Sequence, residues 1–138
     1  MKMIRPIMKD PMFLALPSEA AAEADKQTAR DLLDTLRAHL DGCVGMAANM
    51  IGVRKRIIAV CVGFGQMVMI NPEIAAKSGA YETEEGCLSL AGVRKTTRYE
   101  RIEVVYQDMN MKKHRQHFDG YVAQIIQHEI DHCNGILI

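Results

Sequence analysis

The chain has 138 residues, of which 49% are hydrophobic and 25% charged, a composition typical of a folded globular domain and not of a disordered chain. Lys+Arg and Asp+Glu each number 17, so the formal charge is zero and binding to nucleic acid or to an anionic membrane through bulk charge is not expected. No apolar run is long enough to span a membrane, and none follows the first basic residues as in a signal peptide. We therefore expect one domain over residues 1–138, located in the cytoplasm.

Apolar residues between positions 25 and 40 follow the spacing i, i+3, i+4, i+7 and i+11, which predicts an amphipathic helix. Small residues between glycines in segment 45–52 predict a tight turn. Asn71-Pro72 is expected to end a buried strand. Strands or extended pieces are expected over 56–62, 66–70, 73–77, 80–84, 101–106 and 112–118.

The last predicted element is a helix. Asp119 is a plausible N-cap, apolar residues recur at helical spacing from Val122 to Ile130, and Asn134-Gly135 ends the pattern. A helix, several antiparallel strands and a second helix define the α+β class. We expect antiparallel sheets packed around the C-terminal helix, with one N-terminal helix.

The C-terminal helix carries His128-Glu129-Ile130-Asp131-His132. Residues i and i+4 share one face of a helix, so His128 and His132 can bind one metal ion together. Glu129, beside the first histidine, is then placed to take a proton from a water on the metal. The alternative is a solvated helix end that happens to carry two histidines.

A metal site needs a third protein ligand, and the cysteines are the candidates. Disulfides are improbable in a chain of this size without a signal peptide. Cys87 lies in Glu85-Gly86-Cys87-Leu88-Ser89, after a strand and in a glycine-containing turn, and is the first choice. Cys133 points about 100° away from His132 around the helix and is expected to pack in the core. Cys43 stays open as the other rival.

One thiolate and two imidazoles leave the fourth metal position free, which is typical of a catalytic and not of a structural site. Such a site, with Glu129 as base and then acid, predicts metal-assisted hydrolysis of an amide-like bond. The chemistry favours zinc, but iron, nickel and cobalt also suit this ligand set.

Three motifs together resemble the peptide deformylase family. Its second motif, E-G-C-L-S, stands intact at residues 85–89, and its third, H-E-x-D-H, stands intact at residues 128–132. The first motif, G-x-G-x-A-A-x-Q, is matched in part by residues 43–50, and the resemblance extends over residues 4–135.

The resemblance implies a ferrous ion held by Cys87, His128 and His132, with Glu129 as general acid and base. The substrate would be the N-formyl-methionyl peptide or nascent chain, the product formate, and the ribosome a transient contact. The backbone N–H of Leu88 would stabilise the oxyanion, and Arg98 would help to hold the peptide. The pocket for the methionine side chain would include Gly45, Met46, Tyr121 and Ile125.

The first motif departs from the family at two positions. Cys43 stands where the family has its first glycine, and Met50 stands where the family has glutamine. The family's glutamine donates a hydrogen bond to the formyl oxygen, and a thioether has no proton to donate. Loss of one such donor lowers kcat by about 10²–10³-fold. Asn49 could replace it only if the loop turned differently.

Three functions therefore stay open. The first is a deformylase whose activity is reduced by Met50. The second is a hydrolase of another N-acyl or formyl group, because Met50 changes the oxyanion side of the pocket. The third is a non-catalytic, metal-containing relative that binds peptides, against which the intact Glu129 argues.

Overall fold

Extended segments dominate the chain after residue 44. The computed structural model describes residues 3–63 and 65–138, and within them five strands form one antiparallel sheet in the order β1-β2-β3-β4-β5. Every strand therefore pairs with its neighbours in sequence, and the α+β expectation is confirmed. The strands are β1 (Gly45–Ala47), β2 (Ile57–Val62), β3 (Gly65–Cys87), β4 (Leu90–Gln107) and β5 (Lys113–Asp119).

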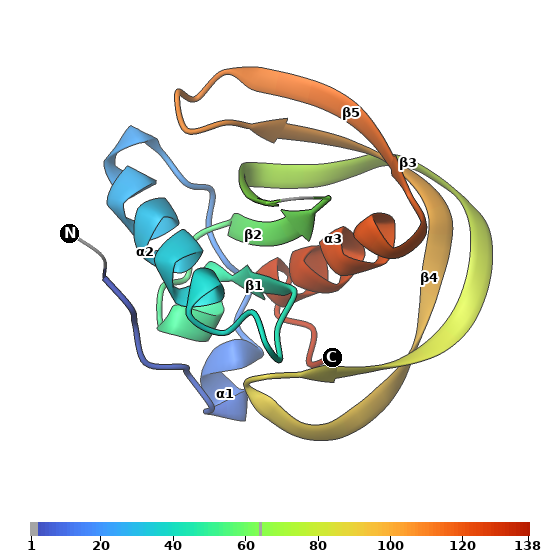
Figure 1. Cartoon of the computed structure of the whole chain (residues 1–138), viewed down its shortest axis with the longest axis horizontal. Coiled ribbons are helices and arrows are strands. Elements are labelled where there is room, and N and C mark those ends of the chain that lie inside the picture. Colours follow the sequence, from blue (N-terminus) through green and yellow to red (C-terminus); the bar gives the residue numbers. More distant parts are fainter. Residues whose placement is uncertain (1–2, 64) are drawn as a thin grey trace.

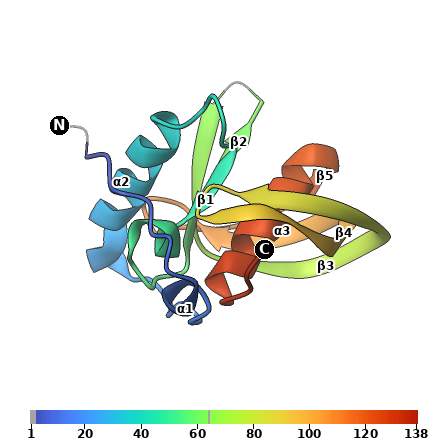
Figure 2. The ribbon, with the colours of Figure 1, turned by 90° about the horizontal axis from the view of Figure 1, so that it is seen from below.

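Helices flank the sheet on both faces (Figures 1 and 2). The predicted helix over 25–40 is α2, and its apolar stripe of Ala29, Leu32 and Leu36 is buried. A short helix in the N-terminal segment escaped prediction because four residues show no periodicity. The helices are α1 (Pro11–Leu14), η1 (Glu23–Asp25), α2 (Lys26–Arg37), η2 (Ala48–Ile51) and α3 (Gly120–Cys133).

The prediction that Asn71-Pro72 ends a strand is wrong. Strand β3 continues through this dipeptide with a register shift between Ile70 and Glu73, and Asn71 takes a positive φ of 53°. Its side chain makes two hydrogen bonds to the backbone of Ala21. Oδ1 accepts from the N–H of Ala21 at 2.7 Å, and Nδ2 donates to the carbonyl of Ala21 at 2.9 Å. The break in pattern is thus a bulge, which lets one long strand bend.

Strand β2 separates two apolar clusters. Ile58 and Val60 pack with α3, whereas Ile57 and Ala59 pack with α2 and η2. The strand is apolar on both faces for this reason, since successive side chains point to opposite sides. Figure 1 shows β3, β4 and β5 curving around α3, and Figure 2 shows α2 on the opposite side of β1 and β2 from α3.

Helix α3 is enclosed on most of its circumference. Its apolar residues Ala123, Ile126 and Ile130 lie in the core, and its polar residues His128 and Glu129 are also buried. The sequence therefore places ionisable groups inside the fold, where they need partners or a function. In the described part of the chain, no helix combines the length and the apolar character that crossing a membrane requires.

We expect Gly135→Ala to destabilise the fold far more than Gly92→Ala. Both glycines have positive φ, 75° and 79°, but a Cβ at Gly135 would lie 2.5 Å from the carbonyl oxygen of Ala15, whereas a Cβ at Gly92 has no atom within 4 Å. Urea unfolding should give a loss of about 1 kcal/mol for Gly92→Ala from backbone strain alone. The loss for Gly135→Ala should be about 3 kcal/mol or more. Equal losses would contradict this packing of the C-terminal segment on Ala15.

Candidate metal centre and active site

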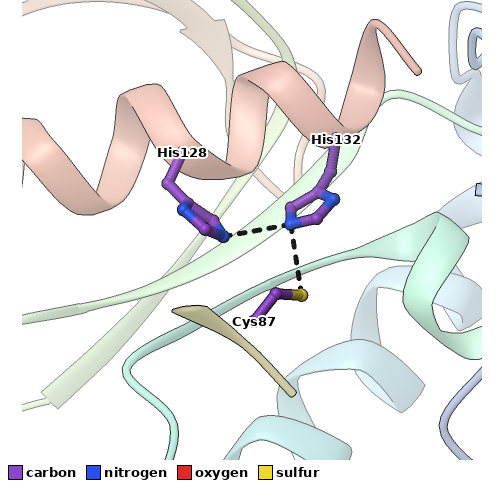
Figure 3. Close-up of side chains that lie close together, drawn as sticks. All are labelled: Cys87, His128 and His132. Carbon is purple, nitrogen blue, oxygen red and sulfur yellow. Dashed lines mark hydrogen bonds between the residues drawn. The ribbon is translucent and has the colours of Figure 1, made fainter. Parts of the chain in front are cut away.

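Three side chains with metal-ligand chemistry converge from β3 and α3. Cys87 is the last residue of β3, and His128 and His132 lie one turn apart on α3 (Figure 3). One ligand atom from each lies within 4.8 Å of the other two. The Nε2 atoms of the histidines are 3.1 Å apart, and Sγ of Cys87 is 3.4 Å from Nε2 of His132. One thiol and two imidazoles facing a common point suit a divalent transition metal.

The rival cysteines lie in different surroundings. Cys133 packs in the apolar core, and burial raises the pKa of its thiol to about 12. Cys43 donates its S–H to the carbonyl of Gly45 at 3.0 Å, and burial raises its pKa to about 11. In the part of the chain that the structure describes, neither belongs to a group of converging metal-ligand atoms.

Glu85 fixes the orientation of His128. The Nδ1–H of His128 donates to Oε1 of Glu85 at 2.8 Å, which leaves Nε2 turned toward Cys87 and His132. Arg98 donates to both oxygens of Glu85 at distances between 2.7 and 3.1 Å, and Gln124 donates to Oε2 at 2.8 Å. A ligating histidine is commonly held by such a carboxylate.

Arg98, to which the resemblance assigns a part in holding the peptide, lies in the interior beside Glu85. It is 3% exposed and does not line the cavity described below. Besides Glu85, its guanidinium donates to Oδ2 of Asp131 at 2.7 Å. The contacts of Arg98 thus join β3, β4 and α3 behind the histidines, and it contributes to the site through Glu85.

The buried charges shift one another's pKa values. Burial alone would raise the pKa of Glu85, but hydrogen bonds from His128, Arg98 and Gln124 lower it to about 2. Burial likewise opposes the charged form of His128, yet contacts with Cys87 and Glu85 raise its pKa to about 10. Glu85 is therefore an anion at neutral pH, and a metal ion that binds His128 would displace the proton from its Nε2.

Burial shifts the pKa values of His132 and Glu129 in opposite directions. Burial and the positive charge on His128 lower the pKa of His132 to about 3, so its imidazole is neutral and available as a ligand. Burial raises the pKa of Glu129 to about 7. Oε1 of Glu129 is buried with no hydrogen-bond partner among the described residues. A carboxyl group of this kind can exchange a proton near neutral pH.

A cavity of about 360 Å³ opens over these groups. Of the residues expected to contact substrate, Gly45, Met50, Tyr121 and Ile125 line it, whereas Met46 is fully buried in the cluster around α2. Tyr121, at 63% exposure, stands at the rim. The full lining is Gly42, Cys43, Val44, Gly45, Met50, Glu84, Glu85, Gly86, Cys87, Leu88, Tyr121, Gln124, Ile125, His128 and Glu129.

Strand β1 lies directly against Glu129. A Cβ added to Gly45 would be 2.9 Å from Oε2 of Glu129 and 2.8 Å from Cγ2 of Ile125, so only glycine fits here. Met50 is 1% exposed, and its Sδ accepts a hydrogen bond from the N–H of Ala47 at 3.5 Å. Asn49 turns away from the cavity and donates through Nδ2 to the carbonyl of His132 at 3.0 Å.

Glu85, Gln124 and Asp131 received no role from the sequence alone. Glu85 and Asp131 lie inside the two motifs that supply the ligands, which was the available signal. Gln124 lies one turn before His128 on the same helix, a spacing that could have placed it near the same partner. The network itself, in which Arg98 joins Glu85 to Asp131 and Gln124 donates to Glu85, was not visible in the sequence.

The geometry agrees with comparisons against known proteins. The polypeptide deformylase family profile matches residues 4–138. A peptide deformylase of Clostridium beijerinckii is 58% identical over 136 residues, which cover 99% of this chain and 100% of the relative. A peptide deformylase of Pelotomaculum thermopropionicum is 45% identical over 86% of this chain and 80% of its own.

Solved structures give the same result. A class I type b peptide deformylase from Acinetobacter baumannii, crystallised with Met-Ala-Ser, superposes with a TM-score of 0.88 at 30% identity, over 99% of this chain and 97% of its own. The Thermotoga maritima peptide deformylase gives a TM-score of 0.84 at 33% identity, over 99% and 95%. With the intact second and third motifs and the converging ligand atoms, these matches establish that the chain belongs to the peptide deformylase family of metal-dependent enzymes, which remove the formyl group from peptides.

Proposed function

We propose that Cys87, His128 and His132 hold one divalent ion, Fe²⁺ in the cell, and that the substrate is the N-formyl-methionyl end of a newly made protein. The convergence of these three ligands on the cavity beside Glu129 is the observation that carries this proposal. Zn²⁺, Ni²⁺ or Co²⁺ would fit the same ligands in isolated protein. We further propose that residues 1–138 form a single catalytic domain acting in the cytoplasm, in transient contact with the ribosome.

Glu129 is proposed as the proton carrier. A bound divalent ion would supply Lewis-acid chemistry, lowering the pKa of water and polarising the formyl carbonyl. Glu129 accepts the proton of the attacking water and passes it to the peptide nitrogen as formate leaves. Its buried, unpartnered Oε1 and its raised pKa of about 7 support both roles.

Leu88 and Met50 are proposed to set the strength of oxyanion stabilisation. Leu88 follows Cys87 directly and lines the cavity, which supports a role for its backbone N–H at the developing charge. Met50 lines the same cavity but offers only a sulfur acceptor, already engaged by the N–H of Ala47. The backbone N–H of Leu88 is therefore the one donor that remains where the family pattern supplies two. Turnover should be slower because the second donor is missing.

The substrate's methionine side chain is proposed to rest on Gly45, Tyr121 and Ile125. Ile125 lies one turn after Tyr121 and one turn before Glu129. A methionine side chain held on Tyr121 and Ile125 would therefore bring the formylated nitrogen of the same methionine toward Glu129. Because Met50 changes the oxyanion side of the cavity, hydrolysis of a different N-acyl group is a second candidate function.

Glu129→Gln should bind one metal ion per chain and release formate from a formyl-Met peptide at least about 10²-fold more slowly, because the amide cannot carry the proton. Glu100→Gln, an exposed carboxylate on β4, is the matched control and should keep wild-type turnover. Formate production by metal-loaded protein is the measurement. Comparable rates for the two variants would exclude Glu129 as the proton carrier.

Cys87→Ala should remove stoichiometric metal, since it deletes one of three ligands, whereas Cys61→Ala should keep it because Cys61 packs in the cluster around α2. Elemental analysis of both purified variants, with circular dichroism as the check on folding, makes the comparison. If folded Cys87→Ala retains one metal ion per chain, the ligand assignment is incorrect.

Met50→Gln should raise kcat on formyl-Met peptides by about 10²-fold, since it restores the missing donor. Met50→Leu, which fills the same space without a donor, should leave kcat near the wild-type value. Steady-state kinetics on both variants tests this. A rate unchanged by Met50→Gln would mean that formyl-Met is not the substrate for which this cavity is built.

A further inference from the structure

Two buried polar atoms beside the proposed ligands lack hydrogen-bond partners among the described residues. They are Nδ1 of His132 and Oδ1 of Asn49, on residues that are both 0% exposed. Buried polar atoms in folded proteins nearly always have a partner, so each exception calls for a specific explanation. Here one atom is a potential donor and the other an acceptor.

The two residues already touch. Nδ2 of Asn49 donates to the backbone carbonyl of His132 at 3.0 Å, across a sequence separation of 83 residues. A carbonyl only accepts, so the amide nitrogen must face it, and the free atom of the side chain must be the oxygen. Asn49 therefore carries an acceptor, Oδ1, that lacks a donor. It is bonded to His132, whose ring carries a donor, Nδ1–H, that lacks an acceptor.

Only one tautomer of the neutral His132 ring leaves Nε2 free to bind a metal ion. Its Nε2 lies 3.4 Å from Sγ of Cys87 and 3.1 Å from Nε2 of His128, so the proton of the neutral ring belongs on Nδ1. Figure 3 shows that Nδ1 of His132 points away from both of these residues. For His128 the corresponding Nδ1–H is held by Glu85 at 2.8 Å, whereas Nδ1 of His132 has no partner among the described residues.

We propose that Asn49 is the positioning residue for His132. Its Oδ1 accepts the Nδ1–H of His132 through one buried water, while its Nδ2 fixes the backbone of the same residue. This pair of contacts holds the tautomer that presents Nε2 to the metal. The inference rests on the proposed metal site, and it assigns a role to a position between Ala48 and Met50 that the family motif leaves open.

Binding of Co²⁺ to the full chain tests this role without reference to turnover. Asn49→Leu removes both contacts at nearly constant size, and Asn49→Asp keeps an oxygen acceptor but loses the amide donor. Thr35→Val, which deletes the hydrogen bonds of a buried hydroxyl with the carbonyl of Asp31 and the N–H of Arg5, is the control for a purely structural loss. The readouts are the Co²⁺ dissociation constant by chelator competition, the visible Co²⁺ spectrum and the melting temperature without metal.

We expect Asn49→Leu to weaken Co²⁺ binding by about 10–100-fold and to alter the Co²⁺ spectrum. Asn49→Asp should weaken binding less, because it loses the contact with the His132 carbonyl but keeps the oxygen acceptor, and Thr35→Val should stay close to wild type. Equal weakening in Asn49→Leu and Asn49→Asp would overturn the acceptor role of Oδ1. Wild-type affinity in Asn49→Leu would overturn the positioning role altogether. A wild-type chain that binds no Co²⁺ would overturn the metal site itself, and is thus distinguishable from a failure at Asn49 alone.

Discussion

Helix α3 brings ionisable side chains into the interior, and the rest of the structure depends on how they are neutralised or used. His128 and Glu129 would be costly to bury without partners. Glu85 from β3 takes the Nδ1–H of His128, and Arg98 from β4 balances the charge of Glu85. The long β3–β4 hairpin that curves around α3 therefore provides the counter-charges as well as the apolar packing. Breaking one partner would leave an uncompensated charge in the core.

This network also gives Glu85 and Glu129 different surroundings. Burial opposes the charged form of Glu85, but hydrogen bonds from His128, Arg98 and Gln124 lower its pKa to about 2, whereas the deeper burial of Glu129 raises its pKa to about 7. Two carboxylates near the same helix thus receive opposite chemistry from their surroundings. Gly45, whose missing side chain leaves room for Glu129, lets β1 close the site from the other side.

Much of the fold and of the metal site could be predicted from the sequence, because short-range patterns specify them. Helical spacing defines α2 and places His128 and His132 on one face, and the glycine-containing turn after a strand singles out Cys87. The path of β3 through Asn71 could not be predicted, since the contacts that satisfy this bulge come from Ala21 and Gln107. The setting of Arg98 was missed for the same reason, because its partners lie 13 and 33 residues away in sequence.

Met50 is the departure from the family motifs that bears most on the proposed mechanism, because its thioether cannot donate a hydrogen bond to an oxyanion. The most direct test is formate release from a formyl-Met peptide by the wild-type chain loaded with Fe²⁺ or Ni²⁺ without oxygen, beside the same peptide carrying an acetyl group. We predict formate from the formyl peptide and little hydrolysis of the acetyl peptide. One metal ion per chain with no formate released would contradict the proposed substrate and mechanism.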